Sequence, residues 1–355
     1  MKRLSLIFTV IVGLGFINPI PIHAKTQIVW TAQSSYPPGL SQIYEPAVRF
    51  AERIEKLTDG ELVVKMNPGD AIVPSKKVFE AVSTGTIDMG MTWAGWSVGM
   101  FNASYLLSNA YPDALQMREM LGWIYAGDGM ELWNEVYKGH GVKVLPPYAV
   151  QGSEILCWSN KPINSLEDFK GLKIRTVGIW GRVLERLGAK VVSLAGGEVY
   201  TAMERGVIDA VEFNTPLTDK ELGLYEISKF VLLPGIHQPA VPLETLVNEK
   251  SWEKLPDHLK LKVEMALRDT SFESMNKTLK QDAEAMQFIR NQKDLKVSKL
   301  TPEMMKEIVK IANEELDVYA KKDPMFAKVL KSQRDFRKLV EPYSELVRLP
   351  YTYAQ

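Results

Sequence analysis

The chain has 355 residues, of which 46% are hydrophobic, and its 43 Lys and Arg residues balance 43 Asp and Glu residues. This zero net charge argues against a nucleic-acid partner or a membrane-surface role, because both favour a basic excess. The single cysteine, Cys157, excludes an internal disulfide and therefore the class of disulfide-stapled secreted domains.

The first 24 residues have the organisation of a secretory signal peptide. Lys2 and Arg3 precede an apolar run over residues 4–17, and Ala24 ends the segment. The run is too short for a spanning helix, although a retained anchor is the alternative. We predict cleavage after Ala24 and a periplasmic location. Loss of Lys2 and Arg3 would leave 41 basic and 43 acidic residues, a net charge of −2.

Two segments of the chain repeat one pattern. "VFEAVSTGTIDMGMTW" (78–93) and "VYTAMERGVIDAVEFN" (199–214) share a Val, an Ala, a Gly, an Ile and an Asp at a constant offset. Each is typical of a short helix, a glycine and a buried strand, and each follows a β-rich segment, 60–66 or 188–194. We therefore expect two parallel strand–helix–strand units with right-handed crossovers, in two similar α/β domains.

The remaining elements follow in chain order. Strands are expected at 26–35, 154–159, 172–177 and 239–249, and helices at 42–60, 256–291, 302–322 and about 324–348. The assigned domains are 25–149 with about 234–275 (domain I), 150–233 with about 276–323 (domain II with connecting helices), and a C-terminal helical extension over 324–355. No flexible linker is evident, so we expect strands that cross between the two domains.

The carboxyl ends of the strands predict a binding cleft between the domains, because open α/β sheets bind ligands there. Residues 91–93 would lie on one side and 212–214 on the other. The polar and aromatic residues expected at this cleft are Gln33, Tyr36, Trp93, Trp96, Gln151, Arg175, Trp180, Glu212, Phe213, Asn214 and Gln238. Core packing is the ordinary alternative for the tryptophans, and loop structure for the glutamines.

Arg175 ends the predicted strand 172–177, which otherwise alternates as a core strand does. A buried guanidinium without a partner is costly. Arg175 therefore needs either an internal carboxylate or an anionic ligand with matching bidentate geometry. The residues alone leave both possibilities open.

Catalytic and cofactor motifs give no positive signal. His140, His237 and His258 lack the spacing of zinc ligands, and the chain has no nucleophile elbow, phosphate-binding loop or dinucleotide fingerprint. An exported enzyme that acts on carboxylated substrates through Glu212 and a bound metal is the alternative to a binding protein.

Several motifs resemble those of the solute-binding proteins of tripartite ATP-independent periplasmic (TRAP) transporters. They are "TAQSSYPPG", "FEAVSTGTIDMG", "LEDFKGLKIRTVG", "LGAKVVSLAGGEVYTAMERGVIDAVEF" and "PGIHQPAVPLETLVNEKSWEKLP", and the resemblance spans essentially the whole mature chain. "IDAVEF" and "GIHQP" resemble the branch that binds 2-oxo or 2-hydroxy acids with a metal cation.

The resemblance implies a two-domain α/β periplasmic solute-binding fold around a ligand cleft, with long connecting helices and an extra C-terminal helix. It implies a receptor that captures a small organic acid and delivers it to a TRAP permease without catalysis or an organic cofactor. A receptor of the same fold that feeds a signalling system, or that takes another organic anion or compatible solute, is an alternative.

The resemblance also assigns site residues. Arg175 would form a two-pronged salt bridge to the ligand carboxylate, and Gln151 would touch both ligand and cation. The expected substrate-binding residues are Gln33, Tyr36, Trp93, Gln151, Arg175, Glu212, Phe213 and Asn214, and the expected cation ligands are Gln151, Glu212, the Phe213 carbonyl, Gln238 and Glu244.

Two departures from the family pattern bear on the site. Phe213 stands where the family usually has tryptophan, which changes the pocket shape. Gln238 replaces a carboxylate found in related members, and a less acidic site favours sodium over calcium. Residues 324–348 resemble the helix through which some relatives form dimers, and a helix packed on its own domain is the alternative.

Overall fold

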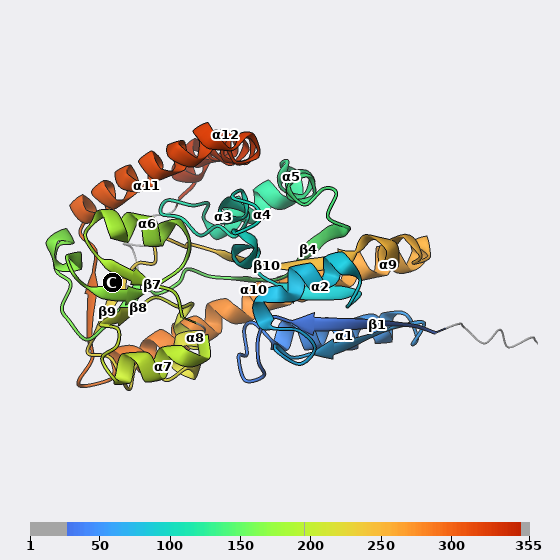
Figure 1. Ribbon diagram of the computed structural model, residues 1–355, viewed down its shortest axis with the longest axis horizontal. Helices are drawn as coiled ribbons and strands as arrows, with labels where there is room; N and C mark the ends of the chain where they lie inside the picture. Colours follow the sequence, from blue (N-terminus) through green and yellow to red (C-terminus); the bar gives the residue numbers. More distant parts are fainter. Residues whose placement is uncertain (1–26, 195, 349–355) are drawn as a thin grey trace, which may run out of the picture.

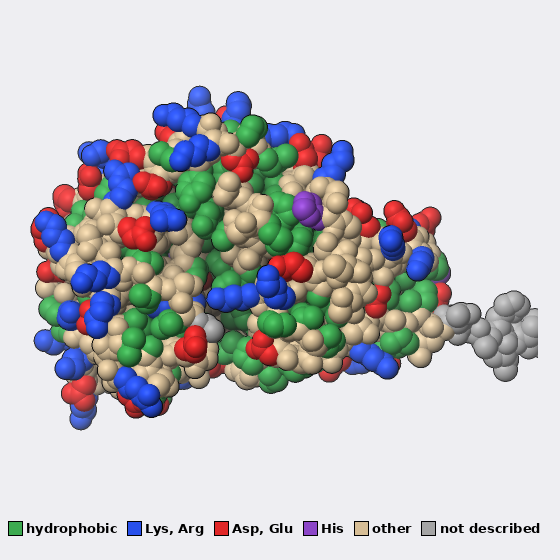
Figure 2. Space-filling model, viewed as in Figure 1, with side chains coloured by type: hydrophobic (Ala, Val, Ile, Leu, Met, Phe, Trp, Pro, Cys, Tyr) green, Lys and Arg blue, Asp and Glu red, His purple; other side chains and the backbone are tan. Residues whose placement is uncertain are grey.

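The computed structural model describes residues 27–194 and 196–348 (Figure 1). The predicted signal peptide lies outside these residues. Within the described part, no helix combines the length and the apolar character needed to cross a membrane. On the face in Figure 2, basic and acidic side chains are interspersed over the whole surface, in keeping with the balanced composition.

The first of two sheets has the strand order β2-β1-β3-β10-β4. Its strands are β1 (Ile28–Ser34), β2 (Leu62–Asn67), β3 (Met89–Thr92), β4 (Val142–Gln151) and β10 (Val241–Asn248). The first three run parallel, whereas β10 is antiparallel to both β3 and β4. Every residue of β10 is buried, because helices cover both faces of this central strand.

The second sheet has the order β11-β9-β5-β8-β6-β7. Its strands are β5 (Cys157–Ser159), β6 (Lys173–Arg175), β7 (Lys190–Val192), β8 (Ala210–Val211), β9 (Phe230–Leu233) and β11 (Lys296–Lys299). We call each sheet with the helices packed on it a lobe, the first and the second. The boundaries assigned to two domains from the sequence stay a prediction.

The predicted repeat is present in both lobes. In the first, β2 leads through α2 (Val78–Thr84) to β3, and in the second β7 leads through α7 (Gly196–Glu204) to β8. The strands of each unit run in the same direction, as predicted. They are not neighbours, however, because β1 lies between β2 and β3, and β6 lies between β7 and β8. Gly85 and Gly206 follow the two helices with φ of +75° and +67°, a conformation that favours glycine.

Helices cover both sheets and join them. The others are α1 (Glu45–Leu57), α3 (Ser104–Leu107), α4 (Met117–Ala126), α5 (Gly129–Val136), α6 (Gly178–Arg186), α8 (Pro216–Glu221), α9 (Glu249–Glu253), α10 (Asp257–Arg290), α11 (Pro302–Lys322) and α12 (Pro324–Leu346). The 34-residue α10 packs on α1 and β4 in the first lobe and on α8 in the second (Figure 1). The helices expected at 42–60, 256–291, 302–322 and 324–348 are all present, whereas β4, β9, β11, α3–α5, α8 and α9 were not predicted.

Two chain segments cross between the sheets, but they are irregular connections between strands and not the crossing strands that were expected. Residues 152–156 connect β4 to β5, and residues 234–240 connect β9 to β10. The segments touch, since the backbone N–H of Glu154 donates to the carbonyl of Gln238 at 3.2 Å. A Cβ added to Gly235 would lie 2.0 Å from the carbonyl oxygen of Glu154, so only glycine fits this crossing.

The first half of α12 packs on its own molecule. Phe326, Val329 and Leu330 are buried there against neighbouring helices, which include α11 and α4. Beyond this part, Leu339 is 75% exposed and Leu346 is 86% exposed. The helix therefore ends with apolar side chains that nothing in the described chain covers.

Candidate functional site

Arg175 lies at the carboxyl end of β6 and is 3% exposed. Its Nη1 donates to the carbonyl of Glu212 at 2.7 Å, its Nε donates to the carbonyl of Leu194 at 3.3 Å, and its guanidinium carbon lies 5.2 Å from the centre of the Phe213 ring. Among residues 27–194 and 196–348, no carboxylate lies within 4.0 Å of Arg175 and nothing accepts a hydrogen bond from Nη2. The guanidinium therefore carries a buried positive charge, and its Nη2 is available to donate to a further acceptor.

Glu212 follows β8 and is also 3% exposed. Its Oε2 accepts from the Thr176 hydroxyl at 2.7 Å, and its Oε1 lies 3.6 Å from Nε2 of His237. Burial alone would raise the pKa of Glu212, but the hydrogen bond and charge of His237, with the charge of Arg175, lower that pKa to about 2. Glu212 is therefore ionised over the physiological pH range.

Glu154 completes a three-residue cluster with His237 and Glu212. Nε2 of His237 lies 3.1 Å from Oε2 of Glu154, and one ligand atom from each of the three residues lies within 4.8 Å of the other two. Burial raises the pKa of Glu154 to about 8, against the opposing effect of His237. Burial alone would lower the pKa of His237, but the two carboxyls raise it to about 9. The carboxyls therefore favour the protonated imidazole, whose Nε2 lies between them, while its buried Nδ1 has no hydrogen-bond partner among the described residues.

This cluster bears on two sequence-based interpretations. Gln238 suggested a site less acidic than one with a carboxylate at that position, and the structure places the carboxyl of Glu154 beside that of Glu212. The histidines gave no metal-ligand spacing, yet His237 lies between two potential ligands. The segments that cross between the lobes bring Glu154 and His237 together, although they are 83 residues apart. The quoted motif "GIHQP" contains His237 and was the one available signal.

Gln151, at the end of β4, connects the cluster to both lobes. Its Nε2 donates to Oδ1 of Asn214 at 2.9 Å and to Oε1 of Gln42 at 3.3 Å. Asn214 in turn donates to Oε1 of Glu154 at 3.4 Å. The side chain of Gln151 is fully buried, yet its Oε1 has no hydrogen-bond partner among the described residues. An enclosed acceptor of this kind calls for a ligand, a cation or a water molecule.

Aromatic side chains line the same region. The ring of Trp180, on α6, stacks on His237 with 5.6 Å between ring centres, and Trp93 packs edge-on against Trp96 at 5.4 Å. The indole N–H groups of Trp180 and Trp93 are buried without a described partner. Tyr36 is half-buried, and burial together with the charges of Glu154 and Glu244 raises the pKa of its phenol.

Three expected site residues have other partners in the structure. Gln33 donates to the carbonyl of Val73 and accepts from the N–H groups of residues 72 and 73, so both ends of its amide hold that loop. Glu244 faces α5, where its Oε2 accepts from Trp133 and Tyr137 at 3.1 Å each, and it lies outside the three-residue cluster. The amide nitrogen of Gln238 donates to the carbonyl of Ser108, which leaves its oxygen for other contacts.

The oxygen atoms of the site suit a hard cation. The carboxyls of Glu154 and Glu212, the unpartnered Oε1 of Gln151 and the carbonyl of Phe213, to which no described N–H donates, are the donor types that sodium and calcium take. The imidazole nitrogen of His237 is a poorer ligand for these ions and suits transition metals better. A hard cation would therefore use the oxygen atoms and compete with His237 for the two carboxyls.

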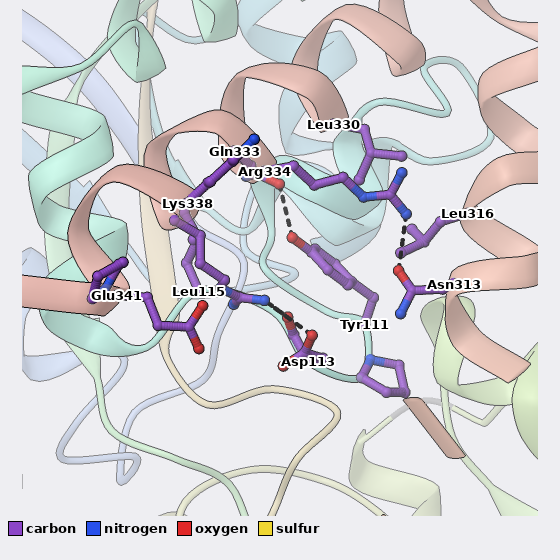
Figure 3. Close-up of a pocket in the computed structure, with 13 residues that line it drawn as sticks. Tyr111, Asp113, Leu115, Asn313, Leu316, Leu330, Gln333, Arg334, Lys338 and Glu341 are labelled. Atoms are coloured by element: carbon purple, nitrogen blue, oxygen red, sulfur yellow. Dashed lines mark hydrogen bonds and ion pairs between the residues drawn. The ribbon is translucent and has the colours of Figure 1, made fainter. Parts of the chain in front are cut away.

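A separate cavity of about 340 Å³ opens on the surface beside α11 and α12 (Figure 3). Its buried polar groups are already paired, since the hydroxyl of Tyr111 donates to Oε1 of Gln333 at 2.9 Å. At its rim, Arg337 forms an ion pair with Asp113 at 3.1 Å. This cavity lacks the unpartnered buried groups of the lobe junction, which remains the candidate site.

Comparisons with known proteins identify the fold. The chain is 29% identical over 322 residues to a monocarboxylate 2-oxoacid-binding periplasmic protein of Nostoc, a match that covers 91% of this chain and 87% of the relative. A TRAP periplasmic solute-binding protein of Colwellia psychrerythraea, solved with calcium and pyruvate, aligns with a TM-score of 0.86 at 27% identity, over 90% of this chain and 97% of that one.

A TRAP periplasmic solute-binding protein of Pseudoalteromonas atlantica, solved with sodium and pyruvate, aligns with a TM-score of 0.87 at 25% identity, over 93% of this chain and 99% of that one. The expected two-lobed α/β solute-binding fold is therefore confirmed. Residues 34–323 match the sequence pattern of the family of bacterial extracellular solute-binding proteins, family 7. The chain belongs to this family, the solute receptors of TRAP transporters.

Proposed function

We propose that the protein is an exported receptor for a 2-oxo or 2-hydroxy monocarboxylate, which it delivers to a TRAP permease without chemical change. The observation that carries this proposal is Arg175, whose buried guanidinium has no carboxylate partner among the described residues and one uncommitted edge. A ligand carboxylate can supply the missing charge and accept the remaining hydrogen bonds in bidentate geometry.

The charges around Arg175 support a singly charged ligand. Protonated His237 and ionised Glu212 cancel, and Glu154 is neutral at a pH below its pKa of about 8. Before a cation enters, Arg175 then leaves the enclosed site with an excess of one positive charge, which a monocarboxylate neutralises.

A cation would be held by Glu212, Glu154, Oε1 of Gln151 and the carbonyl of Phe213. Beside Glu212, such an ion can chelate the ligand carboxylate together with the neighbouring 2-oxo or 2-hydroxy oxygen, which selects acids with an oxygen at that position. With two carboxyls available, the site is acidic enough for calcium as well as sodium. The ions reported with pyruvate in the relatives, calcium and sodium, agree with this choice.

The test is thermal unfolding of the mature protein after refolding to remove any bound solute. Pyruvate, longer 2-oxo acids, lactate, dicarboxylates and sugar acids are each added with and without sodium or calcium. A ligand present at about 100 times its dissociation constant should stabilise the protein by about 2.7 kcal/mol. Arg175→Ala should abolish this effect. Arg182→Ala, which removes an exposed arginine paired with Glu185 on α6, is the matched control and should keep it.

Two results would sink the proposal. One is that no acid of the panel raises the unfolding midpoint under any ionic condition. The other is that Arg175→Ala responds to the acids as fully as Arg182→Ala does, which would make Arg175 a structural residue.

Members of the family are receptors, and we propose that this chain likewise has no catalytic activity. Glu212→Gln separates the receptor from a metal-dependent enzyme. The receptor requires that this variant loses affinity and that the wild-type protein leaves every acid unchanged after long incubation. Product formation by the wild type, lost in Glu212→Gln while affinity persists, would establish the enzyme instead.

We also propose export through cleavage after Ala24, which mass spectrometry of the protein from a periplasmic extract tests directly. The expected N-terminus is Lys25. A protein that keeps residues 1–24 and stays with the membrane fraction would contradict the proposal.

A dimer through the end of α12 is proposed on the exposed Leu339, Tyr343 and Leu346, which lie on one side of this helix at helical spacing. A relative of Bordetella bronchiseptica was solved as a dimer. Leu339→Glu should convert the dimer to a monomer in sedimentation experiments. Leu279→Glu is the matched control, because Leu279 is 77% exposed on α10. A wild type that sediments as a monomer would refute the dimer.

A further inference from the structure

A short segment of the first lobe is fastened to the second lobe beside the candidate site. Ser41 and Gln42 lie between β1 and α1. The N–H and hydroxyl of Ser41 both donate to the carboxylate of Glu221, at 3.1 Å and 2.5 Å, and Glu221 ends α8 in the second lobe. These bonds join residues that are 180 positions apart in the sequence.

Gln42 uses both ends of its amide in the same contact and is 1% exposed. Its Oε1 accepts from the hydroxyl of Thr215 at 2.6 Å, and its Nε2 donates to Oδ1 of Asp282 on α10 at 3.0 Å. The same oxygen of Asp282 accepts from the N–H of Leu217 at 3.1 Å. Gln42 therefore connects the first lobe to the start of α8 and to the long helix that spans both lobes.

The amide of Gln42 also touches the candidate site. Its Oε1 accepts from Nε2 of Gln151 at 3.3 Å, and that nitrogen donates in addition to Asn214. Because an amide is planar, fixing the nitrogen of Gln151 fixes the direction of its Oε1, the enclosed oxygen without a described partner. The position of the lobes is thereby tied to the orientation of a ligand-facing atom.

We propose that Gln42 is a positioning residue that couples lobe closure to solute binding, an inference that rests on the proposed receptor function. In the closed form it fastens the first lobe to α8 and α10 and aims Oε1 of Gln151 at the solute or its cation. The same bonds cannot form when the lobes separate, so they belong to the bound state. Gln42 therefore slows release of the solute and has little effect on its capture.

Stopped-flow tryptophan fluorescence with pyruvate and calcium tests this coupling in the full mature protein. Gln42→Leu keeps an apolar side chain of similar size but removes all three hydrogen bonds. We expect its dissociation rate constant to rise by about tenfold or more, the range for a lost buried hydrogen-bond partner. The association rate constant and the unfolding midpoint of the solute-free protein should stay close to the wild-type values.

Gln333→Leu is the matched control. Gln333 is also 1% exposed and also bonded at both ends of its amide, to Tyr111 and to the carbonyl of Leu106, but it lies at α12. This variant should lower the unfolding midpoint with and without solute and leave the dissociation rate unchanged. As a second variant, Gln42→Glu should also release the solute quickly, because it places a carboxylate against Oδ1 of Asp282.

The outcomes separate this inference from the receptor function. Binding by the wild type with equal dissociation rates for Gln42→Leu and Gln333→Leu overturns the coupling and leaves the receptor intact. If no acid binds the wild type, the receptor proposal fails, and the coupling, which rests on solute binding, is overturned with it.

Discussion

Replacing His237 with glutamine removes the group that separates two buried carboxyls. Nε2 of His237 lies 3.1 Å from Glu154 and 3.6 Å from Glu212, and both carboxyls are 3% exposed. At neutral pH Glu212 is ionised and Glu154 is protonated, so the substitution leaves the buried charge of Glu212 without the imidazolium. Breaking a buried ion pair typically costs about 3–5 kcal/mol. We therefore expect His237→Gln to lower the free energy of unfolding by about 3 kcal/mol or more at neutral pH.

The assay is urea denaturation at neutral pH, first with a chelator and then with calcium. Calcium should restore much of the lost stability, because the oxygen atoms of Glu154, Glu212 and Gln151 can surround the ion in place of the imidazole. The control is His258→Gln. The side chain of His258 is 54% exposed beside Glu61, and its replacement should change the free energy of unfolding by no more than about 0.5 kcal/mol.

Either of two results would refute this reasoning. An equal loss for His237→Gln and His258→Gln would show that the two carboxyls do not depend on the imidazole. A full loss for His237→Gln that calcium leaves unchanged would show that these oxygen atoms do not form a cation site.

Gly235→Ala should lower the free energy of unfolding by about 1–3 kcal/mol or more, because its Cβ would lie 2.0 Å from a backbone oxygen of the other crossing segment. Gly197→Ala, with nothing within 4 Å, should lose no stability in the same urea assay, and equal values for the two would contradict the argument. Burial raises the pKa of Asp282 from 3.8 to about 6. The contribution of Asp282 to the free energy of unfolding should therefore fall by up to about 3 kcal/mol as the pH rises from about 4 to 6. In Asp282→Asn, the free energy of unfolding should not show this decrease. Trp158→Phe removes the indole N–H that donates to buried Asp219 at 2.6 Å, so unfolding should become easier by about 1–3 kcal/mol. A loss near zero would mean that water replaces this donor.

The local sequence pattern was enough to predict two similar α/β halves and the family to which the chain belongs. Each half repeats a helix, a glycine and a buried strand, features that local periodicity and turn chemistry encode. The same local pattern placed Arg175 at the end of a strand. It could not decide whether an internal carboxylate lies opposite, because any such partner comes from a distant part of the chain.

Only the tertiary structure decided which polar groups share the site. Glu154 and His237 meet because two segments cross between the sheets side by side, and no local pattern reports that crossing. A loop binds both ends of the Gln33 amide, and α5 donates to Oε2 of Glu244, whose buried Oε1 has no described partner. A buried polar group must find a partner wherever the folded chain offers one. Local sequence therefore fixes which polar groups reach the strand ends, and long-range packing fixes which of them are left for a solute.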